Sequence, residues 1–140
     1  MILTGVLLSI RPEYVRAILI GRKKFEFRRS LPRRLGGRIY IYATSPIRRI
    51  VASFEVEEVV TDNPVALWRI TRHLSGLDES RFFDYFKGEE TGYALQIGSL
   101  VVFDSPVNPE NLDGRFVPPQ SFCYLDGARE EQLMSLAGIR

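Results

Sequence analysis

The sequence predicts an α+β fold in which five or six short strands form a small, partly open β-barrel flanked by short helices. Three observations lead to this prediction: strand-like apolar or alternating runs recur along the chain, a helical stretch at residues 63–88 interrupts them, and no linker is visible. The composition, with 45% hydrophobic and 26% charged residues, is that of an ordinary globular protein. We therefore expect residues 1–140 to form a single domain.

The first part of the chain alternates strands with one short helix. Val6–Ile10 is a short apolar run of the kind found in buried strands. Pro12 can open a helix at its first turn, where a missing N–H costs no hydrogen bond, and Gly21 can end it. In Lys24–Arg28 two phenylalanines alternate with charged residues, which predicts a strand with one charged face. A basic loop at 30–37 then leads to strands at 38–43 and 47–60, the second with a bulge.

The second part begins with two helices and returns to strands. Asn63 can cap a helix that ends near Gly76, because its side chain can accept from a free N–H of the first turn. Asp78 can cap a second helix, ending at Gly88, in the same way. Aromatic residues of these helices are expected mainly in the core: Trp68, Phe82, Phe83, Tyr85 and Phe86. Strands are expected at 93–97 and 100–103, an extended segment at 118–125 and a surface helix at 127–136.

Charge is distributed unevenly along the chain. The net charge is only +2, but residues 1–50 contain twelve lysines and arginines against two acids, Glu13 and Glu26. This gives +10 for that segment and −8 for the rest. If the basic segment forms one face of the protein, its positive potential suits a polyanion, and nucleic acid is the usual one. In the alternative, the two parts pair with each other across the fold.

Single residues and missing motifs exclude several classes of protein. With one cysteine, Cys123, and one histidine, His73, the chain cannot form an internal disulfide framework or a cysteine-rich zinc site, and we expect no metal ion or cofactor. The motifs of P-loop, dinucleotide-binding, zinc-protease and serine-hydrolase sites are missing. Met1–Gly5 does not resemble a secretion signal, and no apolar run approaches the roughly 20 residues of a membrane span. We therefore expect a cytoplasmic protein with no membrane partner.

The segment Gly21–Arg28 brings three ionisable groups together in the pattern G-x-K-x-x-E-x-R. Glu26 and Arg28 lie on the same side of the expected strand, and Lys23 can reach them from the junction with the helix. Burying such charged groups beside a barrel wall costs free energy unless they are paired or hydrated, so we expect them to line a cleft or to form a buried network. Lys23 and Arg28 can bind a phosphate or a base carbonyl, and Glu26 can accept from an exocyclic amine or a 2′-OH. In the alternative, a Glu26–Arg28 ion pair is purely structural, and the two roles can coexist.

This motif, together with Leu8–Tyr14 before it, resembles the N-terminal signature of ASCH domains, which belong to the PUA-like superfamily. The segments Tyr40–Pro46 and Pro118–Phe122 are similar to those of a prokaryotic ASCH group described as predicted transcriptional regulators. The resemblance implies a PUA-like barrel whose cleft, beside the motif, accepts a nucleotide or an RNA segment.

We therefore predict an RNA- or nucleotide-binding domain, regulatory in role, with DNA as a second polyanion to consider. Aromatic residues near basic ones can stack on bases, and Tyr42 and Phe122 are the first candidates. Hydroxyl and amide groups in loops can read a base edge through hydrogen bonds. The candidate binding residues are Ser9, Arg11, Lys23, Glu26, Arg28, Arg33, Arg34, Tyr42, Thr44, Ser45, Gln120, Ser121 and Phe122.

The alternative function is a small hydrolase acting on a modified nucleoside or on RNA, with Lys23 and Glu26 as catalytic residues. By this resemblance, one ASCH branch, the acetylcytidine amidohydrolases, has a nucleophilic threonine at the position of Glu26. A carboxylate cannot replace that hydroxyl as the nucleophile, but it can act as a general base toward water, assisted by Lys23. Resemblance to a second branch, the ribonucleases, implies cleavage by the RNA's own 2′-OH, supported by Lys23, Glu26 and Tyr42. A third interpretation, a protein-interaction domain, requires an exposed apolar patch on residues 82–86.

Overall fold

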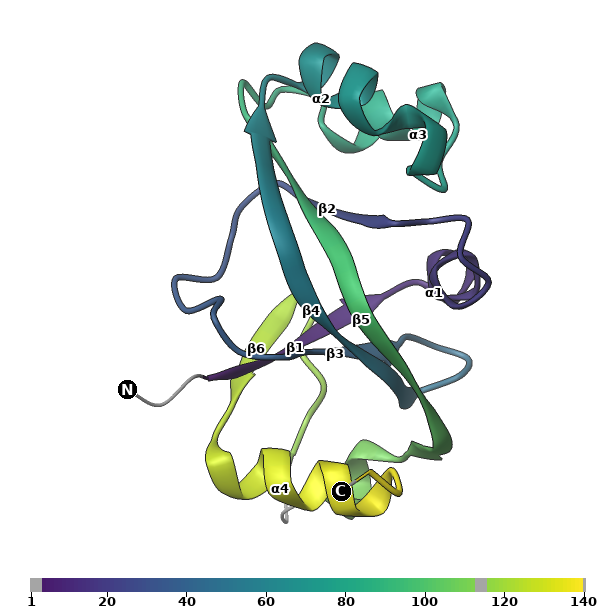
Figure 1. Ribbon diagram of the computed structural model, residues 1–140, viewed down its shortest axis with the longest axis vertical. Coiled ribbons are helices and arrows are strands. Elements are labelled where there is room, and N and C mark those ends of the chain that lie inside the picture. The colour runs from purple at the N-terminus through teal and green to yellow at the C-terminus, as the bar shows by residue number, and fades with distance from the viewer. Residues whose placement is uncertain (1–3, 113–115, 140) are drawn as a thin grey trace.

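The computed structural model describes residues 4–112 and 116–139, so the features expected at residues 1–3, 113–115 and 140 lie outside the described residues. The fold is α+β and is built on one curled six-stranded sheet, as the sequence predicts (Figure 1). The strands are β1 (Gly5–Ile10), β2 (Phe25–Arg28), β3 (Ile39–Ala43), β4 (Arg49–Asp62), β5 (Gly92–Val107) and β6 (Phe122–Leu125). Their order across the sheet is β2-β5-β4-β3-β1-β6. β1 and β3 are parallel, and the other neighbouring pairs are antiparallel.

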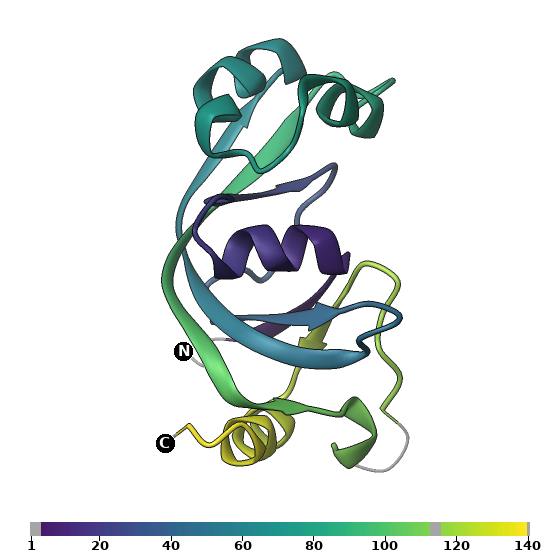
Figure 2. The ribbon, with the colours of Figure 1, turned by 90° about the vertical axis from the view of Figure 1, so that its right-hand side faces the viewer.

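The helices begin where the sequence provides caps. In the described residues the α-helices are α1 (Pro12–Leu19), α2 (Pro64–Thr71), α3 (Glu79–Tyr85) and α4 (Gly127–Leu136). The side chains of Asn63 and Asp78 accept hydrogen bonds from the first turns of α2 and α3, as expected of N-cap residues. Figure 2 shows α1 in the middle of the molecule, with α2 and α3 above it and α4 below. None of the described helices has the length and apolar character required to cross a membrane.

Some element boundaries differ from those predicted. The two stretches predicted at 93–97 and 100–103 form one strand, β5, because the chain continues through bulges at its pairing with β4 instead of turning. The bulge predicted in the preceding strand is confirmed by the same register shifts. α2 ends at Thr71 and continues as a short 3₁₀ helix, η1 (Arg72–Leu74). Of the extended segment predicted at 118–125, only β6 joins the sheet.

The sheet curls around a core but does not close into a full barrel. Alternate residues of β1 and β3 face opposite sides, so that Leu8 and Ile41 pack with α1 while Leu7 and Tyr40 pack toward α4. β2 and β6 form the two edges of the sheet and do not pair with each other. The molecule is therefore open between these edges, next to the segment that carries the ionisable motif.

Aromatic side chains of α2 and α3 form a core cluster with β2, and the core position predicted for Phe82 and Phe86 is confirmed. The rings of Phe27 and Phe82 are 5.1 Å apart at their centroids, and Trp68 lies 4.9 Å from Phe82. Phe82 and Phe86 are both buried. The apolar patch required by the protein-interaction interpretation is therefore not exposed at these two residues.

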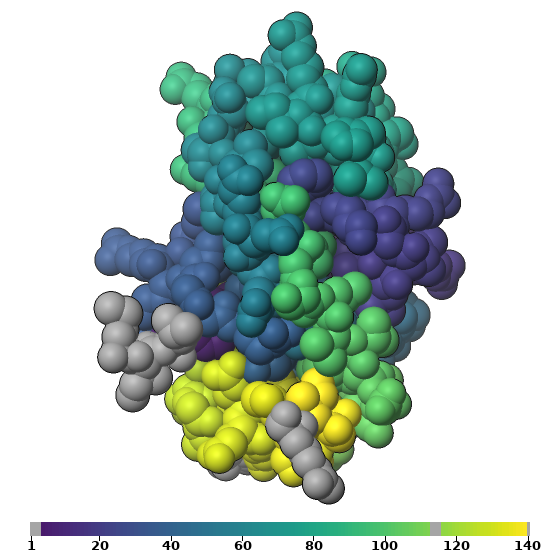
Figure 3. Space-filling model, viewed as in Figure 1, coloured from purple at the N-terminus to yellow at the C-terminus, as the bar shows by residue number. Residues whose placement is uncertain are grey.

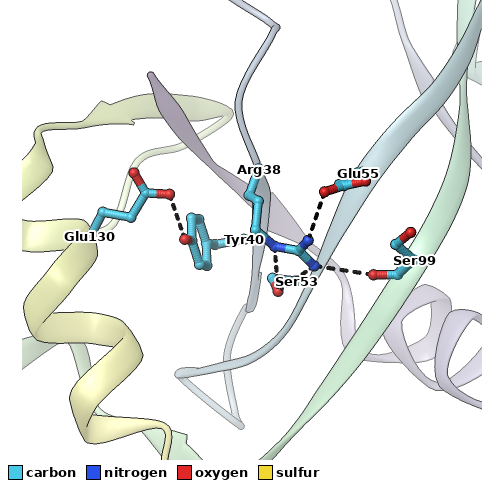
Figure 4. A network of polar contacts seen from close by, with 6 residues as sticks. All are labelled: Arg38, Tyr40, Ser53, Glu55, Ser99 and Glu130. Carbon is cyan, nitrogen blue, oxygen red and sulfur yellow. Dashed lines mark hydrogen bonds and ion pairs between the residues drawn. The ribbon is translucent and has the colours of Figure 1, made fainter. Parts of the chain in front are cut away.

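Polar contacts tie α4 to β3, and link the residue before β3 to β4 and β5 (Figure 4). The hydroxyl of Tyr40 donates to the Glu130 carboxylate at 2.5 Å, and burial together with this contact raises the pKa of the tyrosine. Arg38 donates to the Ser53 hydroxyl and to the carbonyl of Ser99, and pairs with Glu55 at 3.3 Å. None of these residues belongs to β2 or β6, the two edge strands of the sheet.

Candidate functional site

Lys23 is fixed at the junction between α1 and β2 by close packing against the loop after η1. Gly21 allows the turn after α1 with a φ of 82°. Gly76 approaches Lys23 so closely that an added Cβ would lie 2.6 Å from the Cβ of Lys23. The ammonium of Lys23 donates to the carbonyl oxygen of Ser75 at 2.9 Å, and the two residues form an isolated β-bridge. The side chain is therefore held in one position.

The environment of Lys23 disfavours its charged form. The residue is 2% exposed, and its Nζ lies 4.6 Å from the centroid of the Phe27 ring. Burial lowers its pKa from 10.5 to about 8, because desolvation outweighs the attraction of Glu26, and Arg28 adds a further decrease. Lys23 is thus a cation at neutral pH that lacks full solvation and gains from an anionic partner.

Glu26 and Arg28 form the buried ion pair that the sequence offered as its structural alternative. Their side chains meet at 3.0 Å and are each about nine-tenths buried. The Arg28 guanidinium also donates to the Ser121 hydroxyl at 3.0 Å and to the Ser9 carbonyl at 3.2 Å. Arg28 therefore joins β2 to β1 and to the residue before β6, across the open edge of the sheet. Its Nε is buried without a hydrogen-bond partner in the described residues.

A cavity of about 620 Å³ opens above this ion pair, within the size range of small-molecule sites. We call it the first cavity. Five predicted binding residues line it: Ser9, Arg11, Lys23, Glu26 and Arg28. The structure therefore brings these five residues together around one cavity. An open cavity and a buried Glu26–Arg28 ion pair are thus both present, which agrees with the prediction that the two can coexist.

The other predicted binding residues lie elsewhere in the fold. Ser121 contacts Arg28 but does not line the first cavity. Tyr42 is 8% exposed and packs in the cluster beneath α4, so that its ring is not displayed in the cavity. Arg34 lies over the ring of Tyr124 at 4.1 Å. Four more predicted residues do not line the cavity either: Arg33, Thr44, Ser45 and Gln120.

The predicted stacking residue Phe122 is half-buried, beside Tyr124, and also lies outside the first cavity. The aromatic residues that do line it are Tyr14, Phe27 and Tyr85. Tyr85 donates to the carbonyl of Phe27 at 3.2 Å, and Arg29 lies 4.7 Å from the Tyr85 ring. The structure thus places Tyr14 and Tyr85 at the positions where stacking on a ligand is possible.

The sequence reasoning missed the contribution of α3 to the first cavity. Arg81, Asp84 and Tyr85 line it from one face of the helix, while Phe82 and Phe86 point to the core. The spacing of 81, 84 and 85 is that of a single helical face, so this signal was present in the sequence. The prediction did not use this face, because it places all four aromatic residues between 82 and 86 mainly in the core.

The basic N-terminal segment does not pair extensively with the acidic remainder of the chain. Of its twelve cationic side chains, only Arg28 and Arg38 lie within 4.0 Å of a carboxylate in the described residues. Four of the twelve line the first cavity: Arg11, Lys23, Arg28 and Arg29. The other ten of the twelve have no carboxylate within 4.0 Å in the described residues.

The burial of Lys23 has a measurable consequence for stability. Between pH 8 and 10.5 the unfolded chain keeps the Lys23 proton that the folded chain loses, so the free energy of unfolding increases with pH in this window. Relative to Lys23→Met, the wild type should gain up to about 3 kcal/mol across it. Urea unfolding of both proteins from pH 7 to pH 10 measures the difference, and a difference that does not change with pH would contradict the assignment.

Comparison with known proteins places these features in a family. Residues 8–97 match the ASCH domain, and this range contains all the residues that line the first cavity. A protein from Zymomonas mobilis subsp. mobilis named "ASCH domain-containing ribonuclease" is 35% identical over 136 residues, which cover 92% of this chain and 89% of the relative.

Solved structures show the same fold. The crystal structure of ASCH from Zymomonas mobilis superimposes with a TM-score of 0.87 at 32% identity, covering 94% of each chain. Two mutant proteins from the same organism, one with tyrosine replaced by phenylalanine and one with serine replaced by alanine, have TM-scores of 0.86 and 0.87 at 31% identity. They cover 94% of this chain and 97% and 95% of their own.

Proposed function

This chain belongs to the ASCH domain family, and on that premise we propose that it binds RNA, with one nucleotide of the strand in the first cavity. The observation that carries the proposal is the incompletely solvated cation Lys23 at the base of an open cavity that also displays two tyrosines. The name of the Zymomonas relative points to RNA as the substrate of that protein, which supports RNA as the ligand here.

The first cavity offers a separate partner to each part of a nucleotide. Lys23, Arg11 and Arg29 supply positive charge for a phosphate or a base carbonyl. Tyr14 and Tyr85 offer aromatic surface, and stacking of a base on such a ring contributes about 1–3 kcal/mol. The Glu26 carboxylate can accept from a ribose 2′-OH, which would make the site prefer RNA to DNA.

The dependence of binding on salt tests this proposal. Phosphate contacts release counterions, so the affinity for a fluorescent eight-nucleotide RNA should fall steeply between about 50 and 200 mM salt. Fluorescence anisotropy measures it, and a DNA of the same sequence provides the comparison for the 2′-OH. RNA binding that is absent, or that does not change with salt, would contradict the proposal.

A second candidate function is cleavage of the bound RNA, favoured by the 35% identity to a protein named as a ribonuclease. In this route Glu26 accepts the proton of the 2′-OH, the 2′ oxygen attacks the adjacent phosphorus, and the bond to the 5′ oxygen breaks. The products are a 2′,3′-cyclic phosphate and a 5′-OH, whose proton comes from the Lys23 ammonium. Lys23 also stabilises the charge that develops on the phosphate.

Incubation with end-labelled RNA separates the two functions. If the protein is a ribonuclease, the wild type produces fragments with cyclic phosphate ends, and Lys23→Met and Glu26→Gln do not. Exposed residues on α2 and after α3 provide a matched control, Arg69→Gln/Lys87→Gln, which should cleave like the wild type. Intact RNA in the presence of measurable binding identifies a binding domain without nuclease activity.

A further inference from the structure

A second cavity of about 540 Å³ lies beside the first, between the outer face of α1 and the segment that follows α2. Residues from both elements line it, among them Arg16, Arg22, Arg72 and His73. Figure 3 shows the surface of the first part of the chain, in purple, in contact with the teal surface of the α2–α3 region. Basic side chains from two segments about 50 residues apart in sequence thus line the same cavity, which we call the second cavity.

The sequence of α1 explains how the helix serves both the core and the second cavity. Val15 and Ile18 are buried beneath it. Glu13, Arg16, Ala17 and Ile20 follow the i, i+3, i+4, i+7 spacing of one helical face, and all four line the second cavity. The outer face of α1 is therefore a wall of this cavity.

The second cavity carries an excess of uncompensated positive charge. Its two acidic residues, Glu13 and Asp78, lie 3.0 and 3.9 Å from the Arg81 guanidinium, which lines the first cavity. Arg16, Arg22 and Arg72 have no carboxylate within 4.0 Å in the part of the chain that the structure describes. All three are exposed. Guanidinium groups in this state are suited to a phosphate, which they can contact through two hydrogen bonds each.

The two cavities are neighbours with a common wall. Glu13 and Leu77 line both of them. Lys23 lines the first, Ser75 lines the second, and the hydrogen bond between these residues forms part of the partition. A nucleic-acid strand that leaves the first cavity over Leu77 therefore reaches the arginines of the second directly.

We propose that the second cavity binds the backbone phosphates of the same RNA strand whose nucleotide occupies the first cavity. This inference rests on the proposed function and extends it: the ligand is an oligonucleotide, and a single nucleotide occupies the first cavity alone. The first cavity recognises a base, and the second contributes affinity without sequence preference.

Binding measured as a function of RNA length tests this inference. The variant Arg16→Gln/Arg72→Gln removes one cation from each wall, and Arg69→Gln/Lys87→Gln removes two exposed cations that line neither cavity. For an eight-nucleotide RNA at about 50 mM salt, the first variant should bind about tenfold more weakly than the control, and its salt slope should be smaller by about 1.4. Both variants should bind a nucleoside monophosphate like the wild type, and thermal unfolding confirms that each is folded.

The possible results separate this inference from the proposed function. If the wild type binds no RNA, both are wrong. If the wild type binds RNA but the two double variants have equal affinity and equal salt slopes, only the second cavity's role is wrong. An equal loss of affinity for the monophosphate and the octanucleotide would also overturn it, because these arginines would then act on the first cavity.

Discussion

Arg28→Met is expected to lower the free energy of unfolding by about 3–5 kcal/mol. The substitution leaves the Glu26 carboxylate buried without its partner at 3.0 Å, and loss of one member of a buried ion pair has a cost of this size. It also removes the only side chain seen in the described residues to join β2 to both Ser9 and Ser121. Urea unfolding at neutral pH measures the change.

A second variant separates the buried charge from the loss of packing. Glu26→Gln/Arg28→Met removes both charges, so it should recover more than half of the stability lost in Arg28→Met alone. Recovery by the double variant would show that the isolated carboxylate causes most of the loss. If Arg28→Met unfolds like the wild type, Arg28 does not hold the open edge together.

Lys23→Met is expected to reduce affinity for RNA by about tenfold or more while leaving stability at neutral pH within about 1 kcal/mol of the wild type. Methionine fills nearly the same volume and removes a cation whose burial opposes folding, while the carbonyl of Ser75 loses one donor. In the proposed complex with RNA, the same cation would face a phosphate or a base carbonyl. If this variant behaves as expected, Lys23 favours binding at a cost to the free energy of folding.

The pH dependence of binding provides the check for this variant. Lys23 loses its charge as the pH rises through about 8, so the affinity of the wild type for RNA should fall between pH 7 and 9. Lys23→Met should show a smaller fall, because its side chain does not titrate. Equal pH profiles for both proteins, or equal affinities at pH 7, would exclude Lys23 from the ligand site.

Local sequence patterns predicted the floor of the site because that part is made by one short segment. Lys23, Glu26 and Arg28 follow each other within a helix–strand junction, and the two-residue period of β2 places the last two on one side. Three charges near a barrel wall must be paired or hydrated, which predicts an ion pair or a cleft. The structure contains both. The starts of α2 and α3 were also predictable, because an N-cap residue acts on the first turn that follows it in the sequence. Asn63 and Asp78 are these N-caps.

The walls of the site depend on tertiary placement and were predicted less well. Tyr42 was a reasonable stacking candidate next to a basic segment, but its strand lies in the middle of the sheet between β4 and β1, where both faces are covered. Tyr14 and Tyr85 lie 71 positions apart, and only the packing of α3 near α1 brings them to one cavity. A local sequence pattern cannot predict that two residues so far apart in sequence lie close together in space. The spacing of residues 81, 84 and 85 predicts one helical face, but the sequence does not predict which element that face lies against.

The most direct test of RNA binding in the first cavity is photo-cross-linking with an eight-nucleotide RNA that carries a single 4-thiouridine, followed by mass spectrometry of the cross-linked peptides. Adducts are expected on residues that line the first cavity, above all Tyr14 and Tyr85, and they should disappear when unlabelled RNA competes. Adducts confined to other surfaces, for example the exposed stretch of β5 around Val101 and Val102, would contradict the proposed site.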